Sequence, residues 1–357
     1  MKAIVLCAGE GTRLRPLTYT GAKHLIPLAN KPVIYHIIEA IKGAGIEEIG
    51  IVVSPGMEVE FAQHLSNGNK WGVNISYIWQ REPRGLAHAV ACAREFVKGE
   101  PFLVYLGDNL LEEGIEEPVR RFIEEDSEAL ILLTEVEDPR QFGVARLDDE
   151  KIVELVEKPA DPQSNLAVIG AYLFHPQIFE AIAKIKPSFR GELEITDAIQ
   201  RLIDEGYRVS PYLIRGWWKD VGRPEEMLHA NQLLLEKIET RVEGKLDEDS
   251  AKRKRGRMVI EEGAKVEHSV LRGPLIIGRD AMIEDSFIGP FTSIGAGVRI
   301  KKSEIECSIV MEGAKIENAG RRIDNSLIGR DVVINRKDGL PQTYSFVLGD
   351  SSQVRLL

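Results

Sequence analysis

The chain has 357 residues, with 56 acidic against 46 basic side chains and a formal net charge of -10. Because a single hydrophobic core stops growing at roughly 250–300 residues, this length predicts two domains. The acidic balance excludes a protein dedicated to binding nucleic acid or an anionic membrane, since such surfaces need an excess of Lys and Arg. The cysteines Cys7, Cys92 and Cys307 are odd in number and far apart, which predicts a reducing compartment and neither a disulfide framework nor a thiolate metal site.

The apolar segments are too short for export or membrane insertion. The longest stretch without Asp, Glu, Lys or Arg, residues 162–179, includes Asn165 and Pro176 and falls short of the ~20 residues that a spanning helix needs. The apolar start at residues 3–8 is too short for a signal sequence and runs directly into Glu10 and Arg13. We therefore expect a cytoplasmic protein with no membrane partner.

Residues 1–232 alternate short β-branched runs with amphipathic stretches, which is typical of a mostly parallel sheet covered by helices. Buried strands are expected at residues 3–7, 48–53, 102–106, 129–134, 167–174 and 208–214. Between the first two, Pro32 favours a helix start, and apolar residues recur at helical spacing until Gly43 and Gly45 end the helix. The pattern predicts an α/β domain with a mostly parallel sheet.

The composition changes at residues 233–257, where 14 of the 25 residues are charged. This predicts a linker between domains. Its basic cluster from Lys252 to Arg255 closely follows acidic residues, so a solvated segment is favoured over a nucleic-acid patch.

From residue 258 to 357 the sequence repeats with a period of 17 residues. The repeated apolar positions are Ile260, Ile277, Ile294, Met311 and Ile328, and about six residues later Val266, Ile283, Ile300 and Ile334. Short strands stacked coil on coil predict a parallel β-helix followed by a C-terminal tail. Hexapeptide repeats of this kind resemble the left-handed β-helix of acyltransferases and sugar nucleotidyltransferases.

A glycine-rich segment, LCAGEGTRLRPLT at residues 6–18, follows the first expected strand. Gly9 and Gly11 allow backbone N–H groups to approach a charged oxygen, and Arg13 supplies a forked cation suited to phosphate. The P-loop pattern is absent because no Gly-Lys-Ser/Thr follows, and Leu14 occupies the third glycine position of the dinucleotide fingerprint. The segment suits a triphosphate, although two glycines alone are also explained by a tight turn.

Six motifs in order resemble the sugar-1-phosphate nucleotidyltransferase family. They are the loop with Lys23 and Pro27, Gln80 with PRGLAHA at 83–89, GDN at 107–109, FGV at 142–144, VEKP at 156–159, and WKDVG at 218–222. The resemblance covers residues 1–232, for which it implies a Rossmann-like α/β nucleotidyltransferase domain with a mixed, mostly parallel sheet. The hexapeptide repeats cover most of the remainder. Within the family, the chain is most similar to the long-form glucose-1-phosphate thymidylyltransferases.

This resemblance implies transfer of a nucleotidyl group from dTTP to glucose 1-phosphate, giving dTDP-glucose and pyrophosphate. The sugar phosphate is already ionised, so in-line attack on the α-phosphorus needs charge neutralisation and positioning in place of a general base. His88 replaces the glutamine of many relatives, and Ala8 stands where the short thymidylyltransferases have glycine, which leaves base selectivity open. The alternatives are UTP with glucose 1-phosphate, GTP with mannose 1-phosphate, a non-catalytic nucleotide-sugar sensor, and an added acyltransferase in the β-helix, whose single histidine is His268.

The resemblance also assigns roles to residues. The catalytic residues would be Arg13, Lys23, Asp108, Lys158 and Asp220, with Asp108 and Asp220 holding Mg2+. The nucleotide would contact Leu6, Ala8, Gly9, Gly11, Thr12, Arg13, Gln80, Pro83 and Gly85. The sugar phosphate would contact Leu86, Asp108, Gly143, Glu157, Lys158 and Trp218.

Several of these residues also have plain structural explanations. An aspartate at a strand end is commonly a turn cap, and Trp218 suits a core aromatic as well as a sugar site. The run RGELEITD at 190–197 resembles the thymidylyltransferases, but a helix start capped near Thr196 explains it equally. By analogy, the β-helix would serve assembly or feedback control, and we expect a homo-oligomer.

Overall fold

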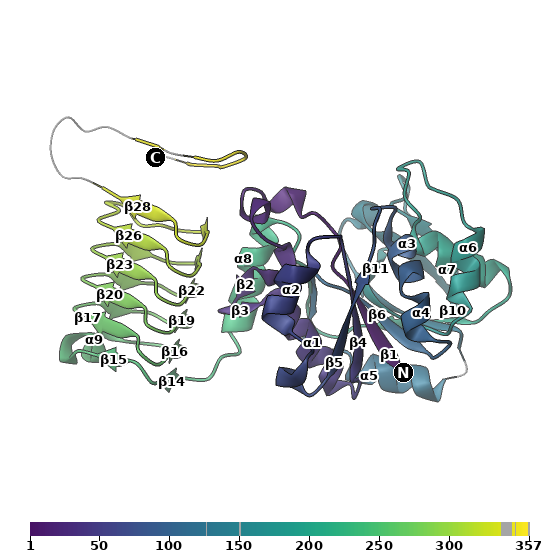
Figure 1. Cartoon of the computed structure of the whole chain (residues 1–357), viewed down its shortest axis with the longest axis horizontal. Helices are drawn as coiled ribbons and strands as arrows, with labels where there is room; N and C mark the ends of the chain where they lie inside the picture. The colour runs from purple at the N-terminus through teal and green to yellow at the C-terminus, as the bar shows by residue number, and fades with distance from the viewer. Residues whose placement is uncertain (126, 150, 337–344, 347, 356–357) are drawn as a thin grey trace. The chain divides into compact units, whose positions relative to one another are not determined.

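The computed structural model describes the chain except for residues 126, 150, 337–344, 347 and 356–357, so part of the predicted C-terminal tail lies outside the described residues. The chain forms two compact units (Figure 1). Unit 1 contains residues 1–10 and 33–220, and unit 2 contains residues 11–32 and 221–357. The stretch that follows the glycine-rich turn therefore belongs to the same unit as the C-terminal repeats.

Unit 1 is built on a mixed nine-stranded sheet. Its strands follow the order β5 (Asn74–Trp79), β4 (Glu48–Val53), β1 (Lys2–Leu6), β6 (Phe102–Leu106), β11 (Leu166–Phe174), β8 (Ala129–Glu135) and β12 (Val209–Leu213), with the hairpin of β9 (Gly143–Asp148) and β10 (Lys151–Glu157) joined to β11. The first four run parallel, and β11 is antiparallel to β6. The α/β fold and all six expected strands are confirmed.

Helices cover the sheet on both sides (Figure 1). One group comprises α3 (Leu86–Cys92), α4 (Arg94–Val97), α6 (Ile178–Lys184) and α7 (Ile195–Asp204), and the other α1 (Val33–Gly43), α2 (Glu58–Leu65) and α5 (Glu116–Glu124). Helix α1 begins directly after Pro32 and ends at Gly43, as the sequence predicts.

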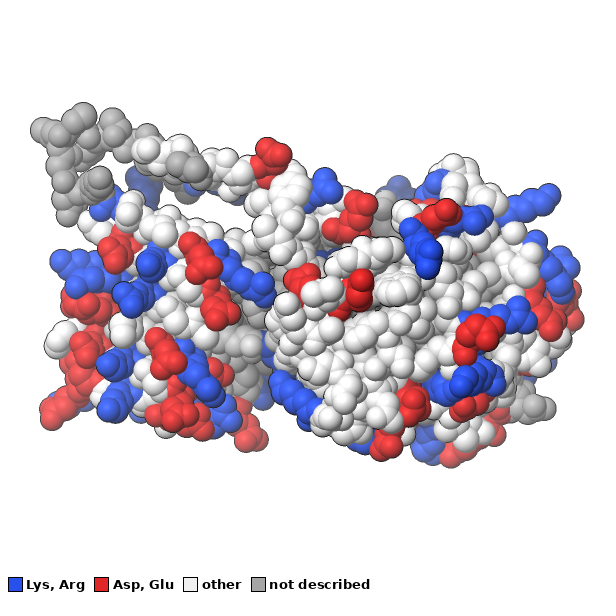
Figure 2. All heavy atoms as spheres, viewed as in Figure 1, with Lys and Arg blue, Asp and Glu red and all other residues white. Residues whose placement is uncertain are grey.

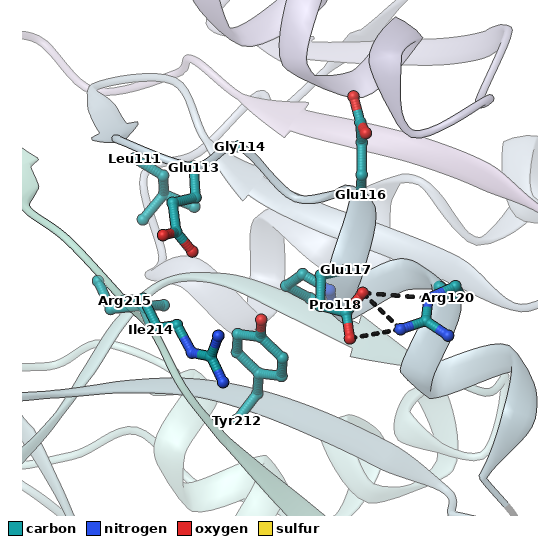
Figure 3. Close-up of a pocket in the computed structure, with 10 residues that line it drawn as sticks. All are labelled: Leu111, Glu113, Gly114, Glu116, Glu117, Pro118, Arg120, Tyr212, Ile214 and Arg215. Atoms are coloured by element: carbon teal, nitrogen blue, oxygen red, sulfur yellow. Dashed lines mark hydrogen bonds and ion pairs between the residues drawn. The ribbon is translucent and has the colours of Figure 1, made fainter.

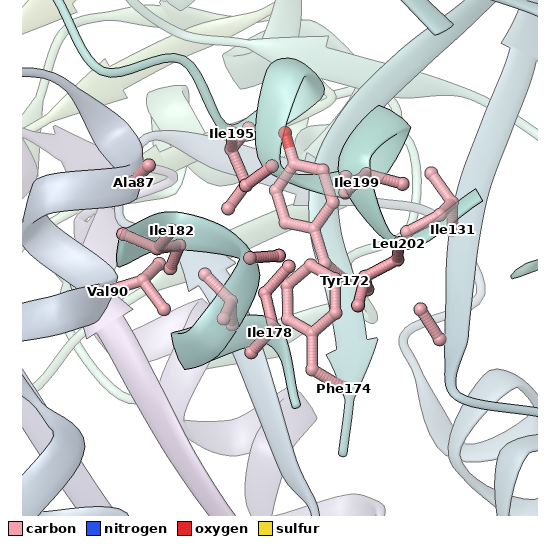
Figure 4. Packing of buried hydrophobic residues seen from close by; sticks show 14 of the residues in the cluster. Ala87, Val90, Ile131, Tyr172, Phe174, Ile178, Ile182, Ile195, Ile199 and Leu202 are labelled. Carbon is pink, nitrogen blue, oxygen red and sulfur yellow. The ribbon is translucent and has the colours of Figure 1, made fainter. Parts of the chain in front are cut away.

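The main core of unit 1 lies between the sheet and the group of α3, α6 and α7 (Figure 4). Tyr172 and Phe174 are two residues apart on β11, so they face the same side, and their rings stack at 5.9 Å. Ile178 of α6 and Ile199 of α7 pack in the same cluster with no exposed surface. Such close packing makes β11 a rigid support for residues at its ends.

Unit 2 contains a parallel β-helix with three sheets, each formed by stacked strands of successive coils (Figure 1). The first sheet is β14 (Arg241–Val242), β16 (Met258–Ile260), β19 (Leu275–Ile277), β22 (Thr292–Ile294), β25 (Ile309–Val310) and β27 (Leu327–Ile328). The second is β15 (Lys245–Leu246), β17 (Lys265–Glu267), β20 (Met282–Glu284), β23 (Arg299–Lys301), β26 (Lys315–Glu317) and β28 (Val333–Asn335). The third is β18 (Val270–Leu271), β21 (Phe287–Ile288) and β24 (Glu304–Ile305).

The stacking register confirms most of the 17-residue period. Ile260, Ile277 and Ile294 are direct partners in successive coils. The next partner is Val310, one residue earlier than the expected Met311, because this coil is one residue shorter; Val310 then pairs with Ile328. Met311 is still buried, so the shortened coil shifts the ladder without exposing an apolar side chain.

The stretch predicted as a charged linker contains regular structure. Helix α8 (Pro224–Leu235) reaches into it, β14 and β15 pair with the β-helix, and α9 (Glu248–Arg253) follows. The basic cluster is balanced locally, since Lys252 and Arg253 form ion pairs with Glu248 and Asp249. Figure 2 likewise shows both charge signs interspersed over the coils. Among the helices that the structure describes, none has the length and apolar character to cross a bilayer.

Candidate functional site

The carboxyl ends of the central strands of unit 1 meet at one edge of the sheet. Gly107 N donates to Leu6 O at 2.9 Å, which aligns the ends of β6 and β1, and Gln80 N donates to Val53 O at 2.9 Å, which aligns β5 with β4. Asp108 follows directly after β6. Open α/β sheets bind ligands at this edge. The predicted site residues Leu6, Gln80 and Asp108 therefore lie where a ligand site is expected.

Two short strands bring the backbones of the two predicted metal ligands close together. β7 (Asn109–Leu111) pairs antiparallel with β13 (Trp218–Asp220), and Asp220 lies opposite Asn109, next to Asp108. Among the described residues, no group of three or more His, Cys, Asp and Glu side chains could enclose a metal. Two carboxylates without further protein ligands suit Mg2+, which usually keeps waters and binds substrate phosphates in its remaining positions. The donor set therefore fits the expected ion.

Asn109 is the central polar residue of this region, and sequence reasoning did not assign it a role. Its side chain is 3% exposed. Its Nδ2 donates to Asp108 Oδ1 at 2.9 Å, while its Oδ1 accepts from Gly170 N at 3.1 Å and from Trp218 Nε1 at 2.6 Å. One buried amide thus orients a predicted metal ligand and a predicted sugar contact.

Trp218 is partly buried and has polar and aromatic contacts. Besides its bond to Asn109, its ring meets that of Phe142 edge to face, with 5.4 Å between centroids. Phe142 precedes Gly143, a predicted sugar contact, so Trp218 lies beside the sugar-binding motif and is not part of the main core cluster.

A second group of predicted residues lies at the ends of β9 and β10. Glu157 is the register partner of Gly143, and its Oε2 accepts from Thr196 Oγ1 at 3.1 Å. Lys158 Nζ lies 3.8 Å from Glu157 Oε1. Burial raises the pKa of Glu157, and the charge of Glu194 raises it further. A buried carboxylate beside a lysine can accept a sugar hydroxyl while the lysine binds a phosphate.

The run at 190–197 belongs to this group, and the capping explanation for it is wrong. Helix α7 begins at Ile195 with Glu194 at its N-cap and no side-chain cap, because Thr196 bonds to Glu157 instead. Glu194 is 3% exposed and accepts from Arg190 at 2.9 Å. The resemblance in the sequence was the available signal for this ion-pair network.

Tyr172 on β11 joins the two groups. Burial raises its pKa, and the charges of Glu157 and Asp108 add to the effect. Both carboxylates therefore lie near enough to this buried tyrosine to oppose its ionisation. The structure thus brings together the predicted sugar-phosphate and metal residues of unit 1, namely Asp108, Gly143, Glu157, Lys158, Trp218 and Asp220.

The predicted base-binding loop is tied to the same region. Gly85 has a φ of +102°, and an added Cβ would lie 2.5 Å from Leu193 O, so only glycine fits there. Gln80 is 6% exposed, and its Nε2 donates to Gly85 O and to His88 Nδ1, both at 3.1 Å. Leu86 begins α3, whereas Pro83 is exposed in the loop.

The start of the loop remains in unit 1, where Ala8 O accepts from Ser54 Oγ at 2.7 Å, while the remaining signature residues lie in unit 2. There Gly11 has a φ of +65° and its carbonyl accepts from Thr18 Oγ1 at 2.8 Å. A Cβ at Gly11 would lie 3.2 Å from Lys23 Cβ. Thr12 and Arg13 are exposed in the following 3-10 turn. Unit 2 thus gathers Gly11, Thr12, Arg13 and Lys23 in one loop, and their contacts to phosphate stay predictions, as does that of Gly9.

A separate cavity of about 280 Å³ lies in unit 1 (Figure 3). Its lining is Leu111, Glu113, Gly114, Glu116, Glu117, Pro118, Arg120, Tyr212, Ile214 and Arg215. Arg120 and Glu117 form an ion pair at 2.6 Å on its wall. In the described chain, none of the predicted site residues lines this cavity.

The sequence was compared with known proteins and structures. The model of the family described as Nucleotidyl transferase matches residues 2–237. A glucose-1-phosphate thymidylyltransferase from Streptomyces griseus is 46% identical over 100% of this chain and 99% of its own, and one from Streptomyces antibioticus is 48% identical with the same coverage. A Bacillus anthracis protein, crystallised with sucrose and provisionally named a glucose-1-phosphate thymidylyltransferase, is 36% identical with a TM-score of 0.63, covering 69% of this chain and 98% of that one.

Proposed function

Since the chain belongs to the nucleotidyl transferase family, we propose that it transfers a thymidylyl group from dTTP to glucose 1-phosphate, giving dTDP-glucose and pyrophosphate. The choice of base and sugar is supported by the two full-length Streptomyces relatives. The observation that supports the reaction class is the register of β13 on β7, in which the backbone of Asp220 lies opposite Asn109, the residue that follows Asp108.

The chemistry is an in-line displacement at phosphorus. A phosphate oxygen of the sugar phosphate forms a bond to the α-phosphorus of the nucleotide, and the bond from that phosphorus to the bridging oxygen of pyrophosphate breaks. The attacking oxygen is ionised at neutral pH, so no protein base has to remove a proton. Catalysis then depends on bringing two anions together and holding them in line, which is a task for fixed charges and hydrogen-bond donors.

The proposed metal ligands are Asp108 and Asp220. A bound Mg2+ would supply positive charge to oppose the repulsion between the two phosphate groups. Asn109 would hold the Asp108 carboxylate in one rotamer through its 2.9 Å bond, so that the carboxylate is pre-oriented before substrates bind.

The proposed sugar-phosphate contacts are Glu157 and Lys158 with Gly143. Glu157 would accept a sugar hydroxyl, since Thr196 occupies only its Oε2 at hydrogen-bond distance. Lys158 would bind the phosphate. Gly143 would leave room for the sugar, because a Cβ there would lie 2.6 Å from Thr196 Cγ2 and 3.3 Å from Glu157 Oε2.

Base recognition is proposed for Gln80. Both amide hydrogens of its Nε2 are directed at protein acceptors, Gly85 O and His88 Nδ1, which leaves its Oε1 to accept a hydrogen bond. Thymine, uracil and guanine offer a ring N–H to such an acceptor, whereas the corresponding ring nitrogens of cytosine and adenine are acceptors. The geometry supports these three bases, and the methyl group of thymine adds only ~1 kcal/mol of discrimination against uracil.

The test is pyrophosphate release by the purified protein with Mg2+, with dTTP, UTP, GTP, CTP and ATP each combined with glucose, mannose and N-acetylglucosamine 1-phosphates. We expect dTTP with glucose 1-phosphate to give the highest kcat/KM. Preference for UTP with glucose 1-phosphate, or for GTP with mannose 1-phosphate, would refute the substrate assignment but not the mechanism.

If the protein binds nucleotide but releases no pyrophosphate with any substrate pair, it would instead be a sensor. The variant Asp108→Asn separates the two functions, because it keeps the shape of the side chain and removes the negative charge of one proposed metal ligand. Product formation should fall at least ~100-fold while dTTP binding persists. The control Asp148→Asn changes an exposed carboxyl at the end of β9 and should leave the rate unchanged. Homo-oligomer formation and a role for the β-helix in assembly or feedback remain predictions.

A further inference from the structure

Asn231 on helix α8 connects two parts of unit 2 that are far apart in the sequence. Its side chain is 1% exposed. Its Oδ1 accepts from Ala29 N at 2.8 Å and from Ser293 Oγ at 2.7 Å, and its Nδ2 donates to Phe291 O at 3.2 Å. Three of the four hydrogen bonds that an asparagine amide can form are therefore made, two of them to the β-helix and one to the segment of residues 11–32.

The partner of Asn231 in that segment is a tight turn. Strands β2 (Pro27–Leu28) and β3 (Lys31–Pro32) form a hairpin whose two connecting residues, Ala29 and Asn30, have φ values of +48° and +59°. A two-residue turn with both φ angles positive is favoured for hairpins, but alanine fits it poorly because its Cβ meets the following carbonyl. The bond from Ala29 N to Asn231 compensates for this conformation.

A second bond fixes the same turn directly on the β-helix. Asn30 Nδ2 donates to Ile294 O at 2.6 Å, one residue beyond Ser293 on β22. Ser293 is fully buried. The turn is therefore held by side-chain bonds to a stack of strands that is itself rigid, and α8 and β2 lie together in Figure 1.

The hairpin continues the loop that carries the predicted phosphate ligands. Lys23 lies in the 3-10 turn Lys23–Leu25, four residues before β2. Leu25 in this turn and Leu28 in β2 are 2% and 0% exposed. Lys23 also packs beside Gly11, whose carbonyl is bonded to Thr18. Fixing the hairpin thus limits the positions open to Lys23.

We propose that Asn231 is a positioning residue through which the β-helix fixes residues 11–32 for binding the triphosphate of the nucleotide. The proposal rests on the proposed function for the identity of the ligand. It gives the β-helix a part in substrate binding within each chain, separate from assembly or feedback.

The test compares full-length variants. Ser293→Ala removes one β-helix bond to Asn231 without touching the loop, and Asn30→Gly removes the direct bond while keeping a residue suited to positive φ. The matched control is Ser286→Ala, which removes a buried β-helix serine bonded to Glu284 O and Ser303 N, away from the loop. Asn231→Ala removes all three bonds, and the two milder variants keep the test valid if this one fails to fold.

We expect the KM for dTTP to rise roughly fivefold in Ser293→Ala and Asn30→Gly, and about tenfold or more in Asn231→Ala. The KM for glucose 1-phosphate should stay within about twofold, because its proposed ligands are in unit 1. Hydrogen exchange of residues 11–32 should also become faster in these three variants and not in Ser286→Ala.

Equal changes in the control Ser286→Ala, a parallel rise in both KM values, or unchanged exchange of residues 11–32 would each overturn the proposal. An inactive wild-type protein would refute the proposed function only, because hydrogen exchange would still report whether Asn231 and Ser293 hold the loop. The two failures are therefore distinguishable.

Discussion

Replacing Asn109 by aspartate tests whether this buried amide controls the Asp108 carboxylate. The change is isosteric, and the new side chain can still accept hydrogen bonds from Gly170 N and Trp218 Nε1. What is lost is the donor to Asp108, which is replaced by a second carboxylate. Folding should therefore be affected much less than by Asn109→Ala, which would leave two donors without a partner at about 1–3 kcal/mol each where they are buried.

The size of the effect follows from the separation of the two groups. At the 2.9 Å between Asn109 Nδ2 and Asp108 Oδ1, two unit charges repel by about 6 kcal/mol if the effective dielectric constant is about 20. Since Asp108 is partly exposed, solvent screening reduces this figure, which is an upper bound. This repulsion makes the pair take up a proton as the pH falls, as closely spaced carboxylates do. At pH 8, where the pair carries two negative charges, the repulsion turns Asp108 away from the position that the Asn109 amide holds, so kcat should fall about 100-fold.

The assay is the pyrophosphate-release rate of Asn109→Asp relative to wild type from pH 5.5 to 8.5, with thermal unfolding recorded in parallel. The relative rate should rise as the pH falls, because a proton on residue 109 restores the donor to Asp108. Asn74→Asp is the matched control: Asn74 Nδ2 also donates to a carboxylate, Glu48 Oε1, at 2.6 Å, but on the exposed edge of the sheet. A relative rate near one at all pH values, or the same loss in the control, would refute the reasoning.

Three further predictions concern other parts of the chain. Gly143→Ala should raise the KM for glucose 1-phosphate at least ~10-fold and leave the KM for dTTP unchanged in steady-state kinetics, because the new Cβ would lie 2.6 Å from Thr196 Cγ2. The raised folded-state pKa of Glu157 means that its ionisation opposes folding, so Glu157→Gln should match wild type in melting temperature near pH 4 and exceed it increasingly as the pH rises; an unchanged difference would contradict this. The bond from Ser250 and those from backbone N–H groups lower the pKa of Asp247 to about 2, so the ionised carboxylate stabilises the fold and loses this effect between about pH 4 and pH 2. Asp247→Asn should therefore melt below wild type at neutral pH and approach it in melting temperature near pH 2.

The fold was largely predictable because its signals are local and repeated. Strands buried on both faces read as continuous apolar runs, and the coil ladder appears as a period in the sequence. The 17-residue period does not hold at Met311, because this coil has one residue fewer and Val310 is the partner of Ile294. The charged composition of residues 233–257 predicts a linker, but β14 in this stretch pairs with β16 of the β-helix. Because both residues of β14 are exposed, its composition resembles that of a linker.

The site was predictable only where a motif carried it. Asp108 and Lys158 follow strand ends, and Glu157 is the last residue of β10. All three match family motifs, and the structure brings them together. Asn109 and Thr196 could not be assigned from the sequence, because their importance comes from partners 61 and 39 residues away. Such long-range hydrogen bonds leave no periodic or local signal, and a turn or cap explains the same residue types.

The distribution of bonds around the carboxylates agrees with a reaction that moves no proton. Asp108 and Glu157 each accept a short bond from a neutral donor, Asn109 at 2.9 Å and Thr196 at 3.1 Å. The nearby cations Lys158 and Arg190 lie farther from Glu157, at 3.8 and 3.7 Å. Neutral donors fix the orientation of a carboxylate without cancelling its charge, and the longer ion-pair distances leave Lys158 able to turn toward a phosphate. The charges are thus held in place before the substrates arrive, which is what electrostatic catalysis of phosphoryl transfer requires.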